Sequence, residues 1–192
     1  MIIKIVRFLV RIFFRIFLNV KISGSENIPK TGGIMLAPNH TSNWDPPFIG
    51  SMSTRPVNFM AKSELFNNKF FGWLIKNLGA FPVERGSADV EAVKNTIRLL
   101  KDGNAVVLFP HGRRIKQDED VPIKDGAVMI AVRSRVPILP VYISGEYKFR
   151  KKIKITFGKP LDLSEYYGLK LTSEQQAELS DMLWSEMKKL NK

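Results

Sequence analysis

The amino-acid sequence predicts an α/β fold: a single αβ sandwich with a mostly parallel sheet flanked by helices, preceded by an amphipathic helix. After residue 20, short apolar runs alternate with longer runs whose apolar residues recur every three or four positions. The 192-residue chain has no repeat, no low-complexity tract and no linker long enough to separate a second domain. We therefore expect a helix over residues 1–20 and one domain over residues 21–192.

Residues 1–20 are strongly apolar but carry a narrow basic stripe. Its members are Lys4, Arg7, Arg11 and Arg15, whose spacing places them on one side of a helix. Such a helix is expected to lie in a membrane interface, with its apolar face in the acyl region and its charges toward anionic headgroups. Two alternatives remain open. One is a helix that crosses the bilayer, which four charges disfavour, and the other is a helix packed on its own domain.

The first half of the domain is expected to begin with an edge strand at 21–24 and a continuously apolar, central strand at 33–38. A short helix follows at 46–52, where Asp45 before a proline makes a good N-cap. The next strand covers 57–61. Residues 63–78 are expected to form a helix that stops at Gly79, and residues 80–83 return as a strand. The apolar face of that helix consists of Leu65, Phe66, Phe70, Trp73 and Leu74.

The second half begins with an amphipathic helix at 88–101, which Gly103 ends. Residues 105–110, AVVLFP, form the clearest buried strand. A helix at 126–134 behind an Asp125 cap, strands at 137–143 and 152–157, and a last helix at about 173–190 complete the chain. Because strands alternate with helices, most of the strands are expected to be parallel.

The composition limits the chemistry. The chain has no cysteine, which excludes a thiolate nucleophile, a disulfide framework and a cysteine metal site. Thirty Lys and Arg residues against eighteen Asp and Glu give a net charge of +12, which predicts an anionic partner. Nucleic acid, anionic lipid headgroups, phosphorylated small molecules and an acidic carrier protein all carry the required charge.

The segment NHTSNWD at 39–45 is the first candidate for catalysis, because it places His40 and Asp45 in the loop after the strand 33–38. Open α/β sheets usually bind their ligands at the carboxyl ends of strands. A histidine takes a proton from a hydroxyl near neutral pH, and a carboxylate on its other ring nitrogen fixes its tautomer. Asp45 could instead serve as a helix cap, or fill both roles. Ser42 is expected to be a turn hydroxyl.

Cationic side chains follow three neighbouring strands. Lys62 comes after the strand 57–61, Arg85 after 80–83, and Arg113 and Arg114 after 105–110. If parallel strands end at one edge of the sheet, these cations reach the loops that carry His40. Converging guanidinium groups match the oxygens of a phosphate. The alternative for each of them is a solvated loop cation in a basic protein.

Four ordered blocks resemble the glycerolipid acyltransferases, and in particular those that acylate 1-acylglycerol 3-phosphate. The blocks are NHTSNWD, GAFPVER, FPHGRR and VPILPVYISG, and the similarity extends over residues 33–160. The third block departs from the family, which usually has FPEGTR. Here His111 replaces the glutamate, and Arg113 replaces the threonine after Gly112.

The resemblance implies a role for each block. His40 and Asp45 correspond to the catalytic pair, and Arg85 to the residue that binds the phosphate of the acceptor, with Lys62 and Arg114 expected to assist. The third block, with His111, Gly112 and Arg113, is expected to position the acceptor. His111 adds a donor beside the cations, which would favour a more anionic ligand. The fourth block is associated with the acyl donor.

The expected reaction is transfer of a fatty acyl group from a thioester to the hydroxyl of lysophosphatidic acid, which gives phosphatidic acid. Acyl-CoA or acyl carrier protein is the co-substrate, and neither a cofactor nor a metal is expected. The expected location is the cytoplasmic face of the cell membrane, as a peripheral or monotopic protein on an anionic bilayer surface. Another lysophospholipid or glycerol phosphate acceptor, or a non-catalytic lipid-binding protein changed at His111, are the alternatives. No nucleic-acid-binding motif occurs, which argues against nucleic acid as the partner.

Overall fold

The computed structural model describes residues 2–84, 90–116 and 119–191. Seven strands form one sheet in the order β1-β7-β6-β2-β5-β3-β4, and all neighbours are parallel except β6 and β7. This confirms the expected α/β fold with a mostly parallel sheet. The strands are β1 (Asn19–Ser23), β2 (Ile34–Pro38), β3 (Val57–Lys62), β4 (Ala80–Val83), β5 (Ala105–Val107), β6 (Ile138–Gly145) and β7 (Lys152–Phe157).

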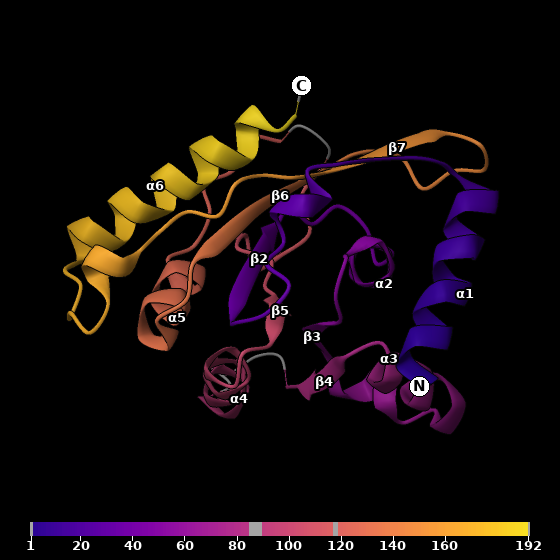
Figure 1. Ribbon diagram of the computed structural model, residues 1–192, viewed down its shortest axis with the longest axis horizontal. Coiled ribbons are helices and arrows are strands. Elements are labelled where there is room, and N and C mark those ends of the chain that lie inside the picture. Colours follow the sequence, from indigo (N-terminus) through magenta and orange to yellow (C-terminus); the bar gives the residue numbers. More distant parts are fainter. Residues whose placement is uncertain (1, 85–89, 117–118, 192) are drawn as a thin grey trace.

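Helices cover both faces of the sheet (Figure 1). One face carries α1 (Ile2–Phe17), α2 (Asp45–Met52) and α3 (Lys69–Asn77), and the other carries α4 (Val90–Lys101), α5 (Gly126–Ser134) and α6 (Ser173–Lys189). The side chains of β2 alternate between two hydrophobic cores, Ile34 and Leu36 on the α1 side, Met35 and Ala37 on the α4 side. The strand is therefore buried on both faces, as its continuously apolar sequence predicts.

The order of the strands places a crevice beside β2. The chain passes from β2 through α2 to β3, returns through β5 between these two strands, and then forms β6 on the other side of β2. Loops at the carboxyl end of β2 therefore lie between chain segments that leave in opposite directions. This is where open parallel sheets place their ligands.

The predicted helix at 63–78 is wrong in its first part. Ser63–Phe66 is a 3-10 helix, and α3 begins only after Asn68, whose side chain accepts a hydrogen bond of 2.9 Å from the Phe71 amide. Gly79 ends the helix with φ +97°, and a Cβ there would collide with the Val57 carbonyl. On the predicted apolar face, Phe66 and Leu74 pack against the core. The other three side chains are exposed: Leu65 at 42%, Phe70 at 75% and Trp73 at 49%.

Two further elements differ from their expected form. β5 ends at Val107, three residues early, because the chain turns at Phe109 and the Gly112 amide donates to the Phe109 carbonyl. The side chain of Asp125 does not cap α5. Its carboxylate accepts a hydrogen bond of 2.8 Å from the Ser180 hydroxyl of α6 instead. Because β5 ends at Val107, the loop that carries the third block begins at Leu108, closer to the sheet than predicted.

The N-terminal helix α1 packs on the domain through part of its basic stripe. Val6 and Phe14 are buried, and Arg7 and Arg11 donate hydrogen bonds to backbone carbonyls at the end of α2. The expectation that the whole stripe faces headgroups is therefore wrong for these two arginines. The helix also ends at Phe17, and residues 19 and 20 already belong to β1.

The outward side of α1 is apolar. No helix in the described part of the chain has both the length and the hydrophobicity needed to cross a membrane. The exposed apolar residues of α1 are Ile5, Phe8, Leu9, Ile12, Phe13, Ile16 and Phe17.

Candidate active site

The loop after β2 holds His40 and Asp45 in contact. The His40 Nδ1 atom lies 2.8 Å from the Asp45 Oδ2 atom, and the side chain of His40 keeps 13% exposure. An ionised carboxylate only accepts hydrogen bonds, so Nδ1 carries the proton and Nε2 keeps its lone pair. The residue before the pair, Asn39, is buried and exchanges two hydrogen bonds with the backbone of Ile143 in β6. The loop therefore leaves the sheet from a fixed point.

Asp45 is fully buried and receives four hydrogen bonds. Its Oδ2 atom accepts from His40 and from the amides of Thr41 and Ser42 at 2.7 and 2.8 Å, and its Oδ1 atom accepts from the Tyr147 hydroxyl at 2.7 Å. None of these amides belongs to α2, whose N-cap residue is Trp44. The interpretation of Asp45 as a side-chain cap of the helix is therefore wrong. Its carboxylate orders the catalytic loop.

Tyr147 completes this network from the segment after β6. Burial, followed by the neighbouring Asp45 carboxylate, raises the pKa of Tyr147 well above its ordinary value, so the phenol stays a hydrogen-bond donor. No sequence pattern indicated this role, because Tyr147 is separated from Asp45 by 102 positions and lies in no recognised motif.

The third block supports His40 from the other side. The Phe109 ring stacks on the imidazole, with centroids 4.1 Å apart and planes 25° from parallel. The Ile115 amide also donates a hydrogen bond of 2.8 Å to the His40 carbonyl. The ring is thus held on one edge by Asp45 and on one face by Phe109, which restricts its rotation.

The predicted cations lie at the expected edge of the sheet, with one exception. Lys62 ends β3 and is exposed, and Arg113 and Arg114 are exposed beyond the neighbouring strand β5. Arg113 forms an ion pair of 3.1 Å with Glu119 and donates to the Arg114 carbonyl. Arg85 lies outside the described residues. Within the described ranges, the candidates that have no acidic partner are Lys62 and Arg114.

His111 does not occupy the position that the sequence suggested. Its side chain is 2% exposed and meets the Trp184 ring of α6 edge-on, with centroids 5.0 Å apart. Neither ring nitrogen has a hydrogen-bond partner among the described residues. Burial lowers the pKa of His111, and the nearby Arg113 and His40 add to this, while the Val121 backbone and Glu119 oppose it. His111 is therefore a buried neutral residue beneath the loop, not a cationic donor beside the ligand.

Gly112 turns the third-block loop. It has φ +67°, a left-handed conformation that favours glycine, and the side chain of Lys124 lies against it. Lys124 also donates its amide to the Pro110 carbonyl at 2.9 Å. These contacts fix the loop between His111 and Arg113 and hold the exposed arginines over the edge of the sheet.

An exposed apolar surface reaches the catalytic loop. Trp44, between His40 and Asp45, is 50% exposed and contacts Phe13 and Phe14 of α1 at 6.2 and 6.1 Å between centroids. A groove of about 340 Å³ between α1 and α3 is lined by apolar side chains only, including Leu9 and Trp73. We call the exposed apolar residues of α1, Trp44, and Phe70, Phe71 and Trp73 of α3 the apolar surface.

Comparisons with known proteins point to one family. A family model described as acyltransferase matches residues 19–144. The chain is 36% identical over 178 residues to the 1-acyl-sn-glycerol-3-phosphate acyltransferase of Bacillus subtilis, covering 89% of this chain and 87% of that protein. It is 34% identical to the protein of the same name from Streptococcus pneumoniae, covering 82% of this chain and 60% of that protein.

A solved structure has the same fold. The chain resembles the crystal structure of the 1-acyl-sn-glycerophosphate acyltransferase of Thermotoga maritima with a TM-score of 0.73 and 28% sequence identity. The similarity covers 98% of this chain and 80% of that one, and therefore includes α1 as well as the sheet.

Proposed function

Because the chain belongs to the acyltransferase family, we propose that it transfers a fatty acyl group from a thioester to the hydroxyl of 1-acylglycerol 3-phosphate, giving phosphatidic acid. The observation that carries this proposal is the hydrogen bond of 2.8 Å between His40 and Asp45 at the carboxyl end of β2. The names of the relatives from Bacillus subtilis and Streptococcus pneumoniae support the acceptor.

His40 acts as the general base. Its free Nε2 atom accepts the proton of the acceptor hydroxyl while the hydroxyl oxygen attacks the carbonyl carbon of the thioester. The tetrahedral intermediate then expels the thiolate, which takes the proton from the imidazolium as the carbon–sulfur bond breaks. Asp45 stabilises the imidazolium between these two steps, and its four hydrogen bonds keep its carboxylate in place.

The route does not pass through an acyl-enzyme. The chain has no cysteine, and the Ser42 hydroxyl accepts a hydrogen bond of 3.2 Å from the Trp44 amide, as a turn residue does. Ser42 is a useful comparison for His40, because it lies in the same loop. Replacing Ser42 with Ala should leave acyl transfer near normal, and a loss as large as that of a His40 variant would favour a covalent route.

The phosphate of the acceptor is bound by cations at the edge of the sheet. Lys62 and Arg114 are exposed and unpaired among the described residues, and Arg85 follows β4, whose last residue Val83 is the register partner of Lys62. Arg113 contributes less, because Glu119 already neutralises it. Binding of the distant phosphate aligns the acceptor hydroxyl with His40, which is how remote binding energy assists the reaction.

The proposal includes a location on a bilayer, which the apolar surface supports. This surface joins α1, α3 and the loop of His40, so acceptor and donor chains can reach His40 from the lipid side. Lys4 and Arg15, exposed on α1 beside the two arginines that bind α2, are left to meet anionic headgroups. The proposed location is therefore that of a peripheral or monotopic protein, on the cytoplasmic face of the membrane.

Mass spectrometry of the products tests the proposed function. The purified protein is supplied with acyl-CoA or acyl carrier protein and with a panel of acceptors that includes 1-acylglycerol 3-phosphate, glycerol 3-phosphate and lysophosphatidylcholine. We expect phosphatidic acid to be the main product with at least one donor. Faster acylation of an acceptor that lacks the phosphate monoester would contradict the proposed acceptor.

A further inference from the structure

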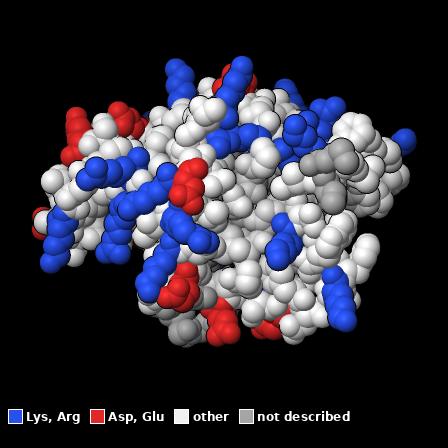
Figure 2. Space-filling view, turned by 60° about the horizontal axis from the view of Figure 1, so that its bottom comes forward, with Lys and Arg blue, Asp and Glu red and all other residues white. Residues whose placement is uncertain are grey.

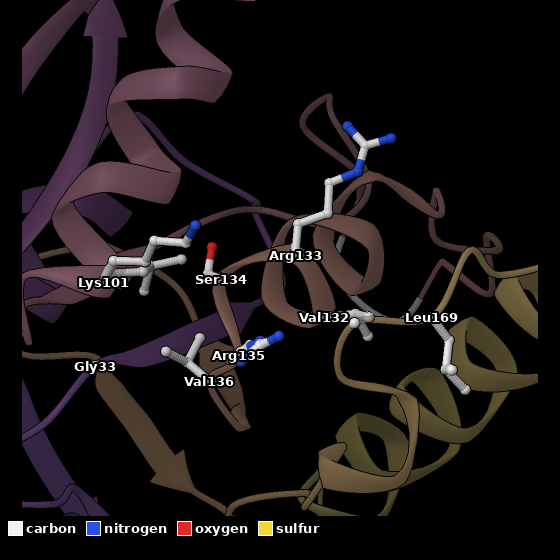
Figure 3. A pocket seen from close by; sticks show the side chains of 10 residues that line it. Gly33, Lys101, Val132, Arg133, Ser134, Arg135, Val136 and Leu169 are labelled. Atoms are coloured by element: carbon white, nitrogen blue, oxygen red, sulfur yellow. The ribbon is translucent and has the colours of Figure 1, made fainter.

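A cavity of the described chain lies away from His40. It has a volume of about 640 Å³ and is lined by the start of β2, the ends of α4 and α5, and the segment before α6 (Figure 3). Gly33 at this cavity precedes β2, whereas His40 follows the other end of the strand. Five strand residues extend over roughly 16 Å. The cavity and the candidate active site therefore occupy opposite edges of the sheet.

The lining is cationic. Lys101, Arg133 and Arg135 contribute to it, and no carboxylate does. None of the three side chains has a hydrogen bond or an ion pair with a described residue. Figure 3 shows Lys101 and Arg135 beside Ser134, with Arg133 extending from the rim. Basic side chains also gather on the side of the molecule that carries α4, α5 and α6 (Figure 2).

The ends of two helices do not account for this charge. Lys101 ends α4 and Ser134 ends α5, and a helix end carries about half a negative charge. Two such ends offset roughly one of the three positive charges, which leaves an excess of about two. Unpaired like charges around one cavity repel each other, and a bound dianion would remove that repulsion.

The backbone of Arg135 is unusual. It follows α5 with φ 58° and ψ 48°, in the left-handed region, and two hydrogen bonds to the last turn of α5 hold it there. Glycine is the usual residue at this position. A Nη atom of Arg135 lies 3.4 Å from the point that a Cβ on Gly168 would occupy, so the guanidinium lies against that glycine. Arg135 therefore has a backbone conformation that is unfavourable for any residue other than glycine, and its charged side chain lines the cavity.

We propose that this cavity binds a small molecule through a phosphate group, held by Arg135 and Lys101. Its volume falls in the range of small-molecule sites, about 300–1,000 Å³. A guanidinium offers paired donors to phosphate oxygens, and an ammonium adds a point charge. Inorganic phosphate and a phosphate monoester carry the same group, and the experiment separates them. This site is independent of the proposed reaction at His40.

The test compares Arg135→Gly with Arg150→Gly. Among the described residues, Arg150 is the other non-glycine residue with a positive φ, 57°, so both substitutions relieve the same backbone conformation and remove one positive charge. Inorganic phosphate and glycerol 3-phosphate are titrated against each purified protein by calorimetry, at constant ionic strength with chloride as the reference anion. The Lys62→Gln/Arg114→Gln variant, which removes two cations of the proposed site of the acceptor phosphate, serves as a further titrated protein.

We expect R135G to weaken phosphate binding roughly tenfold, as loss of one charged donor does, and R150G to leave it unchanged. In Lys62→Gln/Arg114→Gln the binding that R135G weakens should persist, which separates this site from the proposed site of the acceptor phosphate. If glycerol 3-phosphate binds more tightly than inorganic phosphate, the ligand is an ester; equal affinities indicate that the phosphate group alone is recognised. Equal effects of R135G and R150G, or no binding above chloride, would overturn the proposal.

Discussion

Asp45 is the residue on which the candidate active site depends most. The sequence was sufficient to predict its partnership with His40, because the two residues lie in one short loop after a recognisable strand. The other donors to its carboxylate could not be predicted. The amides of Thr41 and Ser42 depend on the loop conformation, and Tyr147 approaches from 102 positions away.

Tyr147→Phe should weaken both the fold and the reaction. It leaves the buried Oδ1 atom of Asp45 without its donor, which costs about 1–3 kcal/mol of the free energy of unfolding. With three donors instead of four the carboxylate is held less firmly, so it orients the His40 imidazole less well and kcat falls, while the KM of the acceptor changes little.

Chemical denaturation and steady-state kinetics measure these two effects. Tyr166→Phe is the control, because the Tyr166 hydroxyl has no hydrogen-bond partner among the described residues. A kcat in Tyr147→Phe equal to that of the wild-type protein would show that the phenol does not position the His40–Asp45 pair.

His111 should make the stability of the protein depend on pH. Burial lowers its pKa below the ordinary value of 6.5, so between the folded and unfolded pKa values the unfolded chain binds more protons. The contribution of His111 to the free energy of unfolding is therefore fully present above about pH 6.5, and it is lost as the pH decreases toward the pKa of His111 in the folded protein.

Denaturation curves between pH 7.5 and pH 5 detect this loss. The His111→Gln variant, which cannot titrate, should lose less stability over that interval than the wild-type protein. Identical losses in the two proteins would mean that His111 does not contribute.

At the scale of elements, α1 illustrates what periodicity predicts and what it cannot. The spacing of its four cations predicted a stripe on one side of a helix. It could not tell which cations meet the domain, because their partners are carbonyls at the end of α2, about 40 positions later. The same reason applies to the predicted helix at 63–78, whose apolar face is largely exposed. Periodicity identifies an apolar face but not what covers it.

Arg7 and Arg11 should stabilise the catalytic loop through α2. Arg7 donates to the carbonyls of Gly50 and Ser53 at 2.8 and 2.7 Å, and Asp45 begins the same helix. Arg7→Gln should therefore lower the free energy of unfolding by about 1–3 kcal/mol and reduce kcat. Lys4→Gln is the matched control, since Lys4 lies on the same stripe and its side chain has no partner in the described part of the chain. Equal effects of the two substitutions would mean that net charge, not the contact with α2, is responsible.

At the scale of the molecule, the mostly parallel sheet and the succession of strands and helices along the chain were predictable, because buried parallel strands have continuous apolar sequences. The apolar surface was only partly predictable. The sequence indicated that α1 is amphipathic, but the joining of α1 to α3 and to Trp44 is a property of the folded chain.

Replacing Phe8 and Ile12 together with Ser should reduce binding to anionic vesicles. Both side chains are exposed, at 61% and 38%, so their replacement should change the free energy of unfolding little. The free energy of binding to the bilayer should weaken by roughly 1.5–3 kcal/mol for each apolar side chain removed. Leu169→Ser is the control, since Leu169 is exposed at the opposite edge of the sheet. Vesicle sedimentation measures the binding. Equal retention on vesicles by the double variant and the wild-type protein would exclude the apolar surface as the membrane contact.

The most direct test of the account is the rate of phosphatidic acid formation by His40→Ala, measured with purified protein, 1-acylglycerol 3-phosphate and the better thioester donor. Loss of the base should lower kcat by about 10²–10⁴-fold while the acceptor still binds, because the cations at the edge of the sheet remain. Turnover near that of the wild-type protein would contradict the assignment of His40 as the general base.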